Sequence, residues 1–188
     1  MWGSADEIAP HLPLGGYLFY AVFGVVFFAL FNLVVHMAIG IVYPGFRKMQ
    51  DREKHEYRSQ IVSLLVTSAA TFFSFYCLLW TCPDGKTFFN DKECREIPRN
   101  CHVWTCNFIA TYLLLDTILL YFIMGVKTPL DRQSMVHHVI AFTNYYMAFW
   151  QQDFAVTSGA AFIILEISTP FVCLRWLFFH HGLKGSMI

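Results

Sequence analysis

The sequence predicts an all-α fold, a polytopic bundle of about five transmembrane helices, on three observations. The chain of 188 residues is 56% hydrophobic, and only 14% of its residues are charged. Soluble domains carry about 25% charged residues. The low share of charged residues and the large apolar surface of this chain therefore indicate a lipid environment. Five long apolar segments follow one another, and a helix that crosses a bilayer needs about 20 such residues. The formal net charge is zero, which gives no indication of a nucleic-acid partner.

The five predicted spans form one transmembrane domain over residues 1–188. They cover residues 14–43, 60–81, 102–125, 134–150 and 155–179. The first segment is the longest, and a long apolar helix fits a bilayer by tilting. It is also too long for the apolar core of a cleavable signal peptide, and no basic residue precedes it, so we expect no such peptide.

Lysine and arginine residues predict how the bundle is oriented. Five of them lie in residues 44–59, and none precedes the first span. Cytoplasmic loops of membrane proteins carry an excess of these residues. Residues 82–101 mix basic with acidic side chains. We therefore expect the N-terminus and residues 82–101 on one side of the membrane and the basic loop on the other.

Four of the six cysteines gather around the second predicted loop, namely Cys82, Cys94, Cys101 and Cys106. If this loop lies outside the cytosol, a disulfide can form there; the alternative is four reduced thiols. Cys77 and Cys173 fall within spans, where we expect them to act as small packing residues.

Two patterns inside the spans predict helix packing. One face of the second span carries small and hydroxyl residues at helical spacing, namely Ser63, Thr67, Ala70 and Ser74. Such residues allow helices to approach closely in lipid. Asn32 and His36 lie one turn apart in the first span. We expect them to bond across helices rather than to line a cavity.

Ionisable side chains inside spans are the strongest indication of function. They are costly at membrane depth and usually face the bundle interior or a cavity. Adjacent helical residues diverge by about 100°. His137 shares its face with a small and polar stripe that includes Asn144, whereas His138 shares an aromatic face with Tyr145. We therefore expect His137 to face inward and to form a hydrogen bond with Asp116 of the third span.

Glu166 of the fifth span is expected to line the same cavity. Pro170 follows four residues later, so the carbonyl of Glu166 loses its helical donor and a kink is expected there. Ser168 is placed to help satisfy the freed backbone. Tyr112, one turn before Asp116, is a second candidate partner for that acid. We expect neither a metal nor another cofactor, because two adjacent histidines of one helix diverge too far to share an ion.

Three segments resemble the TLC family of multi-pass membrane proteins, which includes ceramide synthases. They are YLLLD at Tyr112–Asp116, HHVIAF from His137, and ILEISTPFVCLRW at Ile164–Trp176. The resemblance covers roughly the second to fifth spans. It implies a helical bundle that encloses a lipid-accessible cavity. The family has a further helix, so the resemblance also implies that the last family helix is missing, disordered or outside this sequence.

The resemblance implies a lipid ligand, held by Asp116, Asn144, Glu166 and Ser168. In ceramide synthases the histidine pair belongs to the acyl-transfer site, so His137 and His138 would be the catalytic residues here. The family's second acid is missing in this chain, which has Thr169 after Glu166. Acyl transfer therefore stays an alternative to lipid binding without turnover.

We expect a protein that binds or handles lipid in an intramembrane cavity and contributes to membrane lipid homeostasis. The alternatives are an acyltransferase of the ceramide-synthase type and a non-catalytic accessory subunit of a large membrane complex. The expected partners are membrane lipids or acyl chains, and other membrane subunits in the last case. The expected location is the endoplasmic reticulum, with the mitochondrial inner membrane as the alternative.

Overall fold

The computed structural model describes residues 8, 14–151 and 154–183, and these residues are mostly helical. The elements in chain order are α1 (Leu14–Val42), η1 (Pro44–Lys48), α2 (Asp51–Trp80), η2 (Pro83–Gly85), α3 (Lys92–Glu96), α4 (Asn100–Leu119), η3 (Leu120–Met124), α5 (Pro129–Gln151), α6 (Phe154–Phe162), η4 (Ile163–Ile167) and α7 (Ser168–His180). The predicted all-α class is confirmed.

Three helical stretches of the described chain are long and apolar enough to cross a membrane. They cover Leu18–Val42, Asp51–Trp80 and Asn100–Met124, the last of which joins α4 to the π-helical turn η3. They coincide with the first three predicted spans. The fourth prediction, residues 134–150, corresponds to α5, which begins five residues earlier at Pro129.

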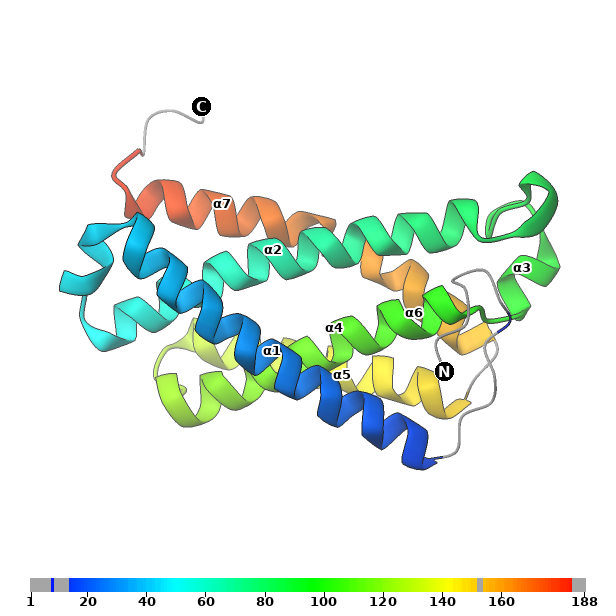
Figure 1. Cartoon of the computed structure of the whole chain (residues 1–188), viewed down its shortest axis with the longest axis horizontal. Helices are drawn as coiled ribbons and strands as arrows, with labels where there is room; N and C mark the ends of the chain where they lie inside the picture. The colour runs from blue at the N-terminus through cyan, green and yellow to red at the C-terminus, as the bar shows by residue number, and fades with distance from the viewer. Residues whose placement is uncertain (1–7, 9–13, 152–153, 184–188) are drawn as a thin grey trace.

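The long helices run in alternating directions, so the connections gather at two ends of the molecule (Figure 1). The start of α1 and the α2–α4 connection with α3 lie at one end. The basic turn η1, the α4–α5 connection and the end of α7 lie at the other. The basic loop and residues 82–101 are thus at opposite ends, as the orientation of the predicted spans requires.

Helix α4 lies at the centre of the bundle, and α1, α2, α5 and α6 all pack against it. The small-residue face of α2 makes close contacts as expected. Ala70 is fully buried, and the hydroxyl of Ser74 donates to the carbonyl of Ala160 in α6. Close approach of this kind stabilises helix pairs in lipid, where burial of apolar surface alone gives little.

The expected cross-helix bonding of the first span is wrong for Asn32. Its side-chain amide donates to the carbonyl of Phe28 in its own helix, at 3.0 Å. His36 instead places its ring against the ring of Phe46 in η1, with the ring centroids 5.2 Å apart. A polar group that finds a partner one turn away within its own helix needs no partner on another helix.

The fifth predicted span is not a single helix. Residues 163–167 form a short 3-10 turn, after which the chain leaves one neighbour for another. Helix α6 packs on α4 and α5, whereas α7 packs along α2 (Figure 1). Pro170 lies in the first turn of α7, where its missing N–H costs no helical hydrogen bond. The predicted kink is therefore a 3-10 segment that precedes the proline, and the backbone stays helical through it.

One disulfide joins Cys82 to Cys94 and ties the end of α2 to α3, with 5.9 Å between the two Cα atoms. Cys101 and Cys106 are buried in α4 and take no part in a disulfide. Cys77 and Cys173 are buried as well, in agreement with their expected packing role. Of the two alternatives for the loop cysteines, the structure therefore has the disulfide, with one pair oxidised and one pair reduced.

Candidate functional site

Four ionisable side chains from three parts of the chain meet in one cluster, which we call the polar cluster: Asp116, His137, His138 and Glu166. Nδ1 of His138 lies 3.4 Å from Oδ2 of Asp116. Nε2 of His137 lies 3.5 Å from Oε1 of Glu166. The two imidazole rings are 5.7 Å apart between centroids. The groups therefore form one continuous line from α4, through α5, to η4.

The structure pairs the histidines differently from the prediction, which joined His137 to Asp116 and gave His138 no partner. His138, not His137, lies against Asp116, and its side chain is 16% exposed against 55% for His137. The reason is the rotation of α5. Tyr145 is buried at 6% exposure, whereas Asn144 is exposed. The large aromatic face of α5 fills the contact with the bundle, so the small polar stripe turns outward and Asn144 does not join the cluster.

Helix α2 contributes a hydroxyl group next to Asp116, the buried acid of the polar cluster. The hydroxyl of Ser59 lies 3.5 Å from Oδ1 of Asp116. Ser59 was not predicted, although it lies one turn before Ser63 and continues the small-residue face of α2. Tyr112 does not bind Asp116 as suggested, because its hydroxyl forms a short hydrogen bond with Ser63. The Asp116 side chain is only 14% exposed.

The 3-10 segment between α6 and α7 positions the acid at the other end of the cluster. Glu166 is in η4, and the hydroxyl of Thr169 donates to its Oε2 at 2.7 Å. Thr169 thus contacts the polar cluster, whereas the sequence analysis noted it only as a departure from the family pattern. Ser168, predicted to help line the cavity, is exposed, and the structure does not bring it to the cluster.

The polar cluster contains a buried acid, Asp116, and an accessible imidazole, that of His137. Asp116 and His138 are mostly buried, and His137 is half exposed. Exposed apolar side chains surround the accessible end, among them Val136 and Ile140 on α5. In a bilayer such side chains face lipid. A polar group carried by a lipid can therefore reach His137 from the side of the protein.

The chemistry open to this arrangement is hydrogen bonding and proton transfer. Each imidazole lies beside a carboxylate, 3.4 Å away for His138 and 3.5 Å away for His137. Within the described part of the chain, no three His, Cys, Asp or Glu side chains are arranged to hold a metal ion.

A comparison with protein families gives one match. The model of the TLC domain (TRAM, LAG1, CLN8) matches residues 56–186, which include all four members of the polar cluster and leave out α1. No curated protein and no solved structure shows significant similarity to the chain. Since the match covers well over half of the sequence, the chain belongs to the TLC-domain family of membrane proteins.

Proposed function

We propose that this TLC-domain protein binds a membrane lipid whose polar group contacts the polar cluster. The observation that supports this proposal is the line of four ionisable groups from Asp116 to Glu166, in which Asp116, His138 and Glu166 are mostly buried and His137 is half exposed. Ionisable residues at membrane depth are rare and usually mark a binding or transport path.

Unused hydrogen-bonding capacity supports the same proposal. Nδ1 of His138 is buried and makes no hydrogen bond, although it lies 3.4 Å from Asp116, because the contact lacks hydrogen-bond geometry. A buried polar atom without a partner costs about 1–3 kcal/mol. A hydroxyl, amide or phosphate group of a lipid that entered at His137 would supply partners. The hydrocarbon part of that lipid would lie along the exposed apolar surface of α5.

The experiment is to identify the lipid that copurifies with the protein. The protein is extracted into nanodiscs from its own membrane, and bound lipids are measured by mass spectrometry against the bulk membrane. We expect one lipid class to be enriched, and Asp116→Asn and His137→Ala to lose that enrichment. Thr143→Ala is the matched control, because Thr143 is exposed on α5 and bonds only to the carbonyl of Val139. Equal lipid content in all four proteins would refute the proposal.

Acyl transfer is the second candidate, favoured by the contact of His138 with Asp116. An imidazole held by a carboxylate can act as a general base toward an acyl thioester. We expect no ceramide synthase turnover, since the chain has Thr169 where the second acid of the synthases is expected. Purified protein with an acyl thioester and a sphingoid base provides the test. Turnover that disappears in His138→Ala would make the protein an acyltransferase.

The proposed location is the endoplasmic reticulum membrane, with the mitochondrial inner membrane as the alternative. The disulfide between Cys82 and Cys94 supports a compartment in which one face of the membrane is oxidising. Fractionation of cells that express the tagged full chain distinguishes the two membranes.

A further inference from the structure

Helices α1 and α2 form a V that holds α4 between its arms. The arms join through η1 at one end and diverge toward α3 at the other (Figure 1). Gly24 marks the crossing of α1 and α4, since a Cβ atom there would lie only 2.6 Å from the Thr111 hydroxyl. Phe108 of α4 closes the narrow part of the V. Its ring centroid lies 5.0 Å from that of Phe28 in α1 and 6.2 Å from that of Phe73 in α2.

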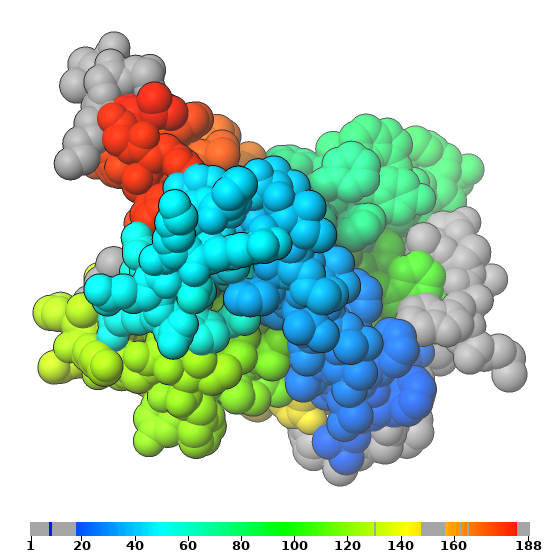
Figure 2. Space-filling model, turned by 60° about the vertical axis from the view of Figure 1, so that its left-hand side comes forward, coloured from blue at the N-terminus to red at the C-terminus, as the bar shows by residue number. Residues whose placement is uncertain are grey.

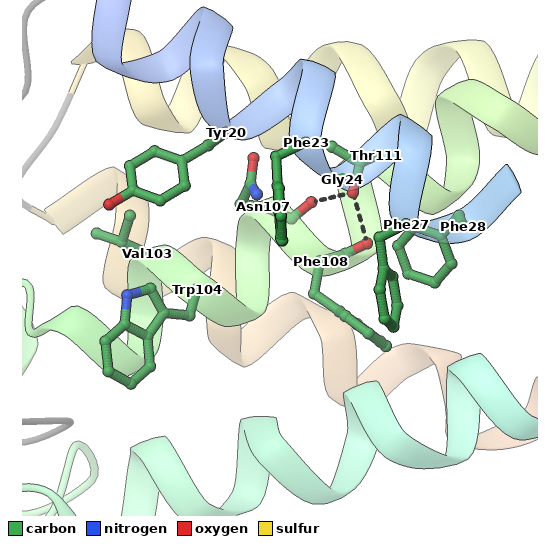
Figure 3. Close-up of a pocket in the computed structure, with 10 residues that line it drawn as sticks. All are labelled: Tyr20, Phe23, Gly24, Phe27, Phe28, Val103, Trp104, Asn107, Phe108 and Thr111. Carbon is green, nitrogen blue, oxygen red and sulfur yellow. Dashed lines mark hydrogen bonds between the residues drawn. The ribbon is translucent and has the colours of Figure 1, made fainter. Parts of the chain in front are cut away.

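Two apolar hollows occupy the open part of the V, one on each side of α4. The first, of about 240 Å³, lies between α1 and α4 and is lined largely by phenylalanine rings (Figure 3). The second, of about 430 Å³, lies between α2 and α4, with Phe73 and Tyr76 in its wall. Trp104 and Phe108 line both hollows and form a ridge between them. Part of α4 is visible from outside between α1 and the end of α2 (Figure 2).

Hydroxyl groups in the floor of both hollows already have partners. The Thr111 hydroxyl donates to the carbonyls of Asn107 and Phe108 (Figure 3). The Thr105 hydroxyl donates to the carbonyl of Cys101 at 2.7 Å. A helical hydroxyl that bonds to the preceding turn requires nothing from a ligand. The hollows therefore suit a ligand part that is purely hydrocarbon.

We propose that the two hollows bind the two hydrocarbon chains of one membrane lipid, with the ridge of Trp104 and Phe108 between the chains. The walls belong to spans, so lipid chains are the molecules that surround them in a membrane. The larger volume falls within the roughly 300–1,000 Å³ of small-ligand sites. A shared ridge with a hollow on each side matches a forked ligand.

The lipid head group lies at the α3 end in this arrangement. Tyr76 stacks on exposed Trp80 there, with 6.5 Å between ring centroids. Tyrosine and tryptophan are enriched where membranes meet water. The chains then point from this belt toward Phe108, at which the V closes.

This site is separate from the polar cluster. Trp104 and Asp116 lie about 18 Å apart along α4, at 1.5 Å per residue. Helix α1 forms one wall of the site and lies outside the matched TLC domain. The two-chain site can therefore exist whether or not the polar cluster binds lipid.

The experiment uses a two-chain phospholipid with a photoreactive diazirine on one chain, incorporated into nanodiscs with the full chain. Crosslinked peptides are mapped by mass spectrometry. We expect labelling of residues 23–28 and 72–76 well above that of Phe171, an equally exposed ring on α7 outside the V. Unlabelled two-chain lipid should compete, and single-chain lysolipid should compete much less. Equal labelling at Phe171, or equal competition by both lipids, would overturn the proposal.

Three variants complete the test. Trp104→Ala removes the ridge, and Phe27→Ala removes a half-exposed ring from the wall of the smaller hollow, where it lies edge-on against Phe28. Both should lose most of the labelling within the V. Phe171→Ala should leave it unchanged, and so should His138→Ala, which reports on the polar cluster instead. Unchanged labelling in Phe27→Ala and Trp104→Ala would count against the site.

Discussion

The buried members of the polar cluster depend on one another because they lie where water is scarce. Asp116 and His138 are both mostly buried and in contact. A charged group at membrane depth is costly, and a nearby opposite charge removes part of that cost. The half-exposed His137 depends less on its partner, since lipid head groups and water can reach it.

A double-mutant cycle tests this dependence. His138→Ala should lower the free energy of unfolding by about 1–3 kcal/mol, as for other substitutions that leave a cavity, because it removes the ring that lies 3.4 Å from buried Asp116. Adding Asp116→Ala should cost less than the sum of the two single changes, as expected for residues in contact. Thermal unfolding in detergent micelles measures all three. His137→Ala is the control and should cost less than His138→Ala. Additivity within about 0.5 kcal/mol would show that the pair is not coupled.

The residues of this cluster could be predicted from the sequence, but their pairing could not. Helical periodicity separates His137 from His138 by about 100° and leaves open which of them faces inward. The polarity of the stripe that His137 shares with Asn144 favoured His137 as the residue that faces inward. The bundle buries Tyr145 instead, because a large ring fills the contact between α5 and its neighbours. The sequence of one helix does not show how large a side chain its neighbour in the bundle can accommodate.

Among the elements, the start of α5 is fixed by a capping box. The backbone N–H of Asp131 donates to the Thr128 hydroxyl at 3.1 Å, and the Asp131 carboxylate accepts from the N–H of Thr128 at 2.7 Å. The same carboxylate accepts from the backbone of Lys127 and from the guanidinium of Arg52 in α2, each at 3.0 Å. One acid thus caps α5 and ties it to α2.

This acid predicts a pH dependence of stability. Burial by itself would raise the pKa of Asp131, but the hydrogen bonds from Thr128 and Arg52 outweigh it and lower the pKa to about 2. A carboxylate whose pKa is lower in the folded state stabilises that state above its unfolded pKa of about 3.9. This contribution should be lost as the pH falls from about 4 toward 2.

Asp131→Asn should reduce the loss of stability in that pH window, measured by unfolding in detergent at a series of pH values. Asp51→Asn is the matched control at the same end of the molecule, because Asp51 is exposed and its ion pair with Lys54 is at the surface. An acid profile that is the same in both variants would contradict the role of Asp131.

The positions of the helices were predictable to within a few residues except where α2 and α5 extend past their apolar segments. The fifth predicted span shows why the remaining features of the fold could not be predicted. Pro170 and Glu166 indicated a kink, but the structure has the 3-10 segment η4, after which α7 packs mainly along α2, whereas α6 packs on α4, α5 and α2. Which partner a helix selects depends on residues far away in the sequence.

At the scale of the whole molecule, charge and redox state indicate the same orientation. The disulfide between Cys82 and Cys94 lies at the end of the bundle where α1 begins. Disulfides persist on oxidising sides of membranes. The basic residues of 44–59 lie at the opposite end, where positive charge indicates the cytosol. Two independent properties of the chain thus distinguish its two ends.

Accessibility in sealed vesicles tests this orientation. Lys92→Cys in α3 and Lys48→Cys in η1 each place a thiol at an exposed position. A membrane-impermeant maleimide should label them from opposite faces, because α2 crosses the bilayer between them. The natural free cysteines are buried and should give little background before the membrane is dissolved. Lys127→Cys, exposed in the α4–α5 connection, is the control and should behave like Lys48→Cys. Labelling of Lys92→Cys and Lys48→Cys from the same face would mean that α2 does not span the membrane, and the arrangement of both lipid sites would have to be rebuilt.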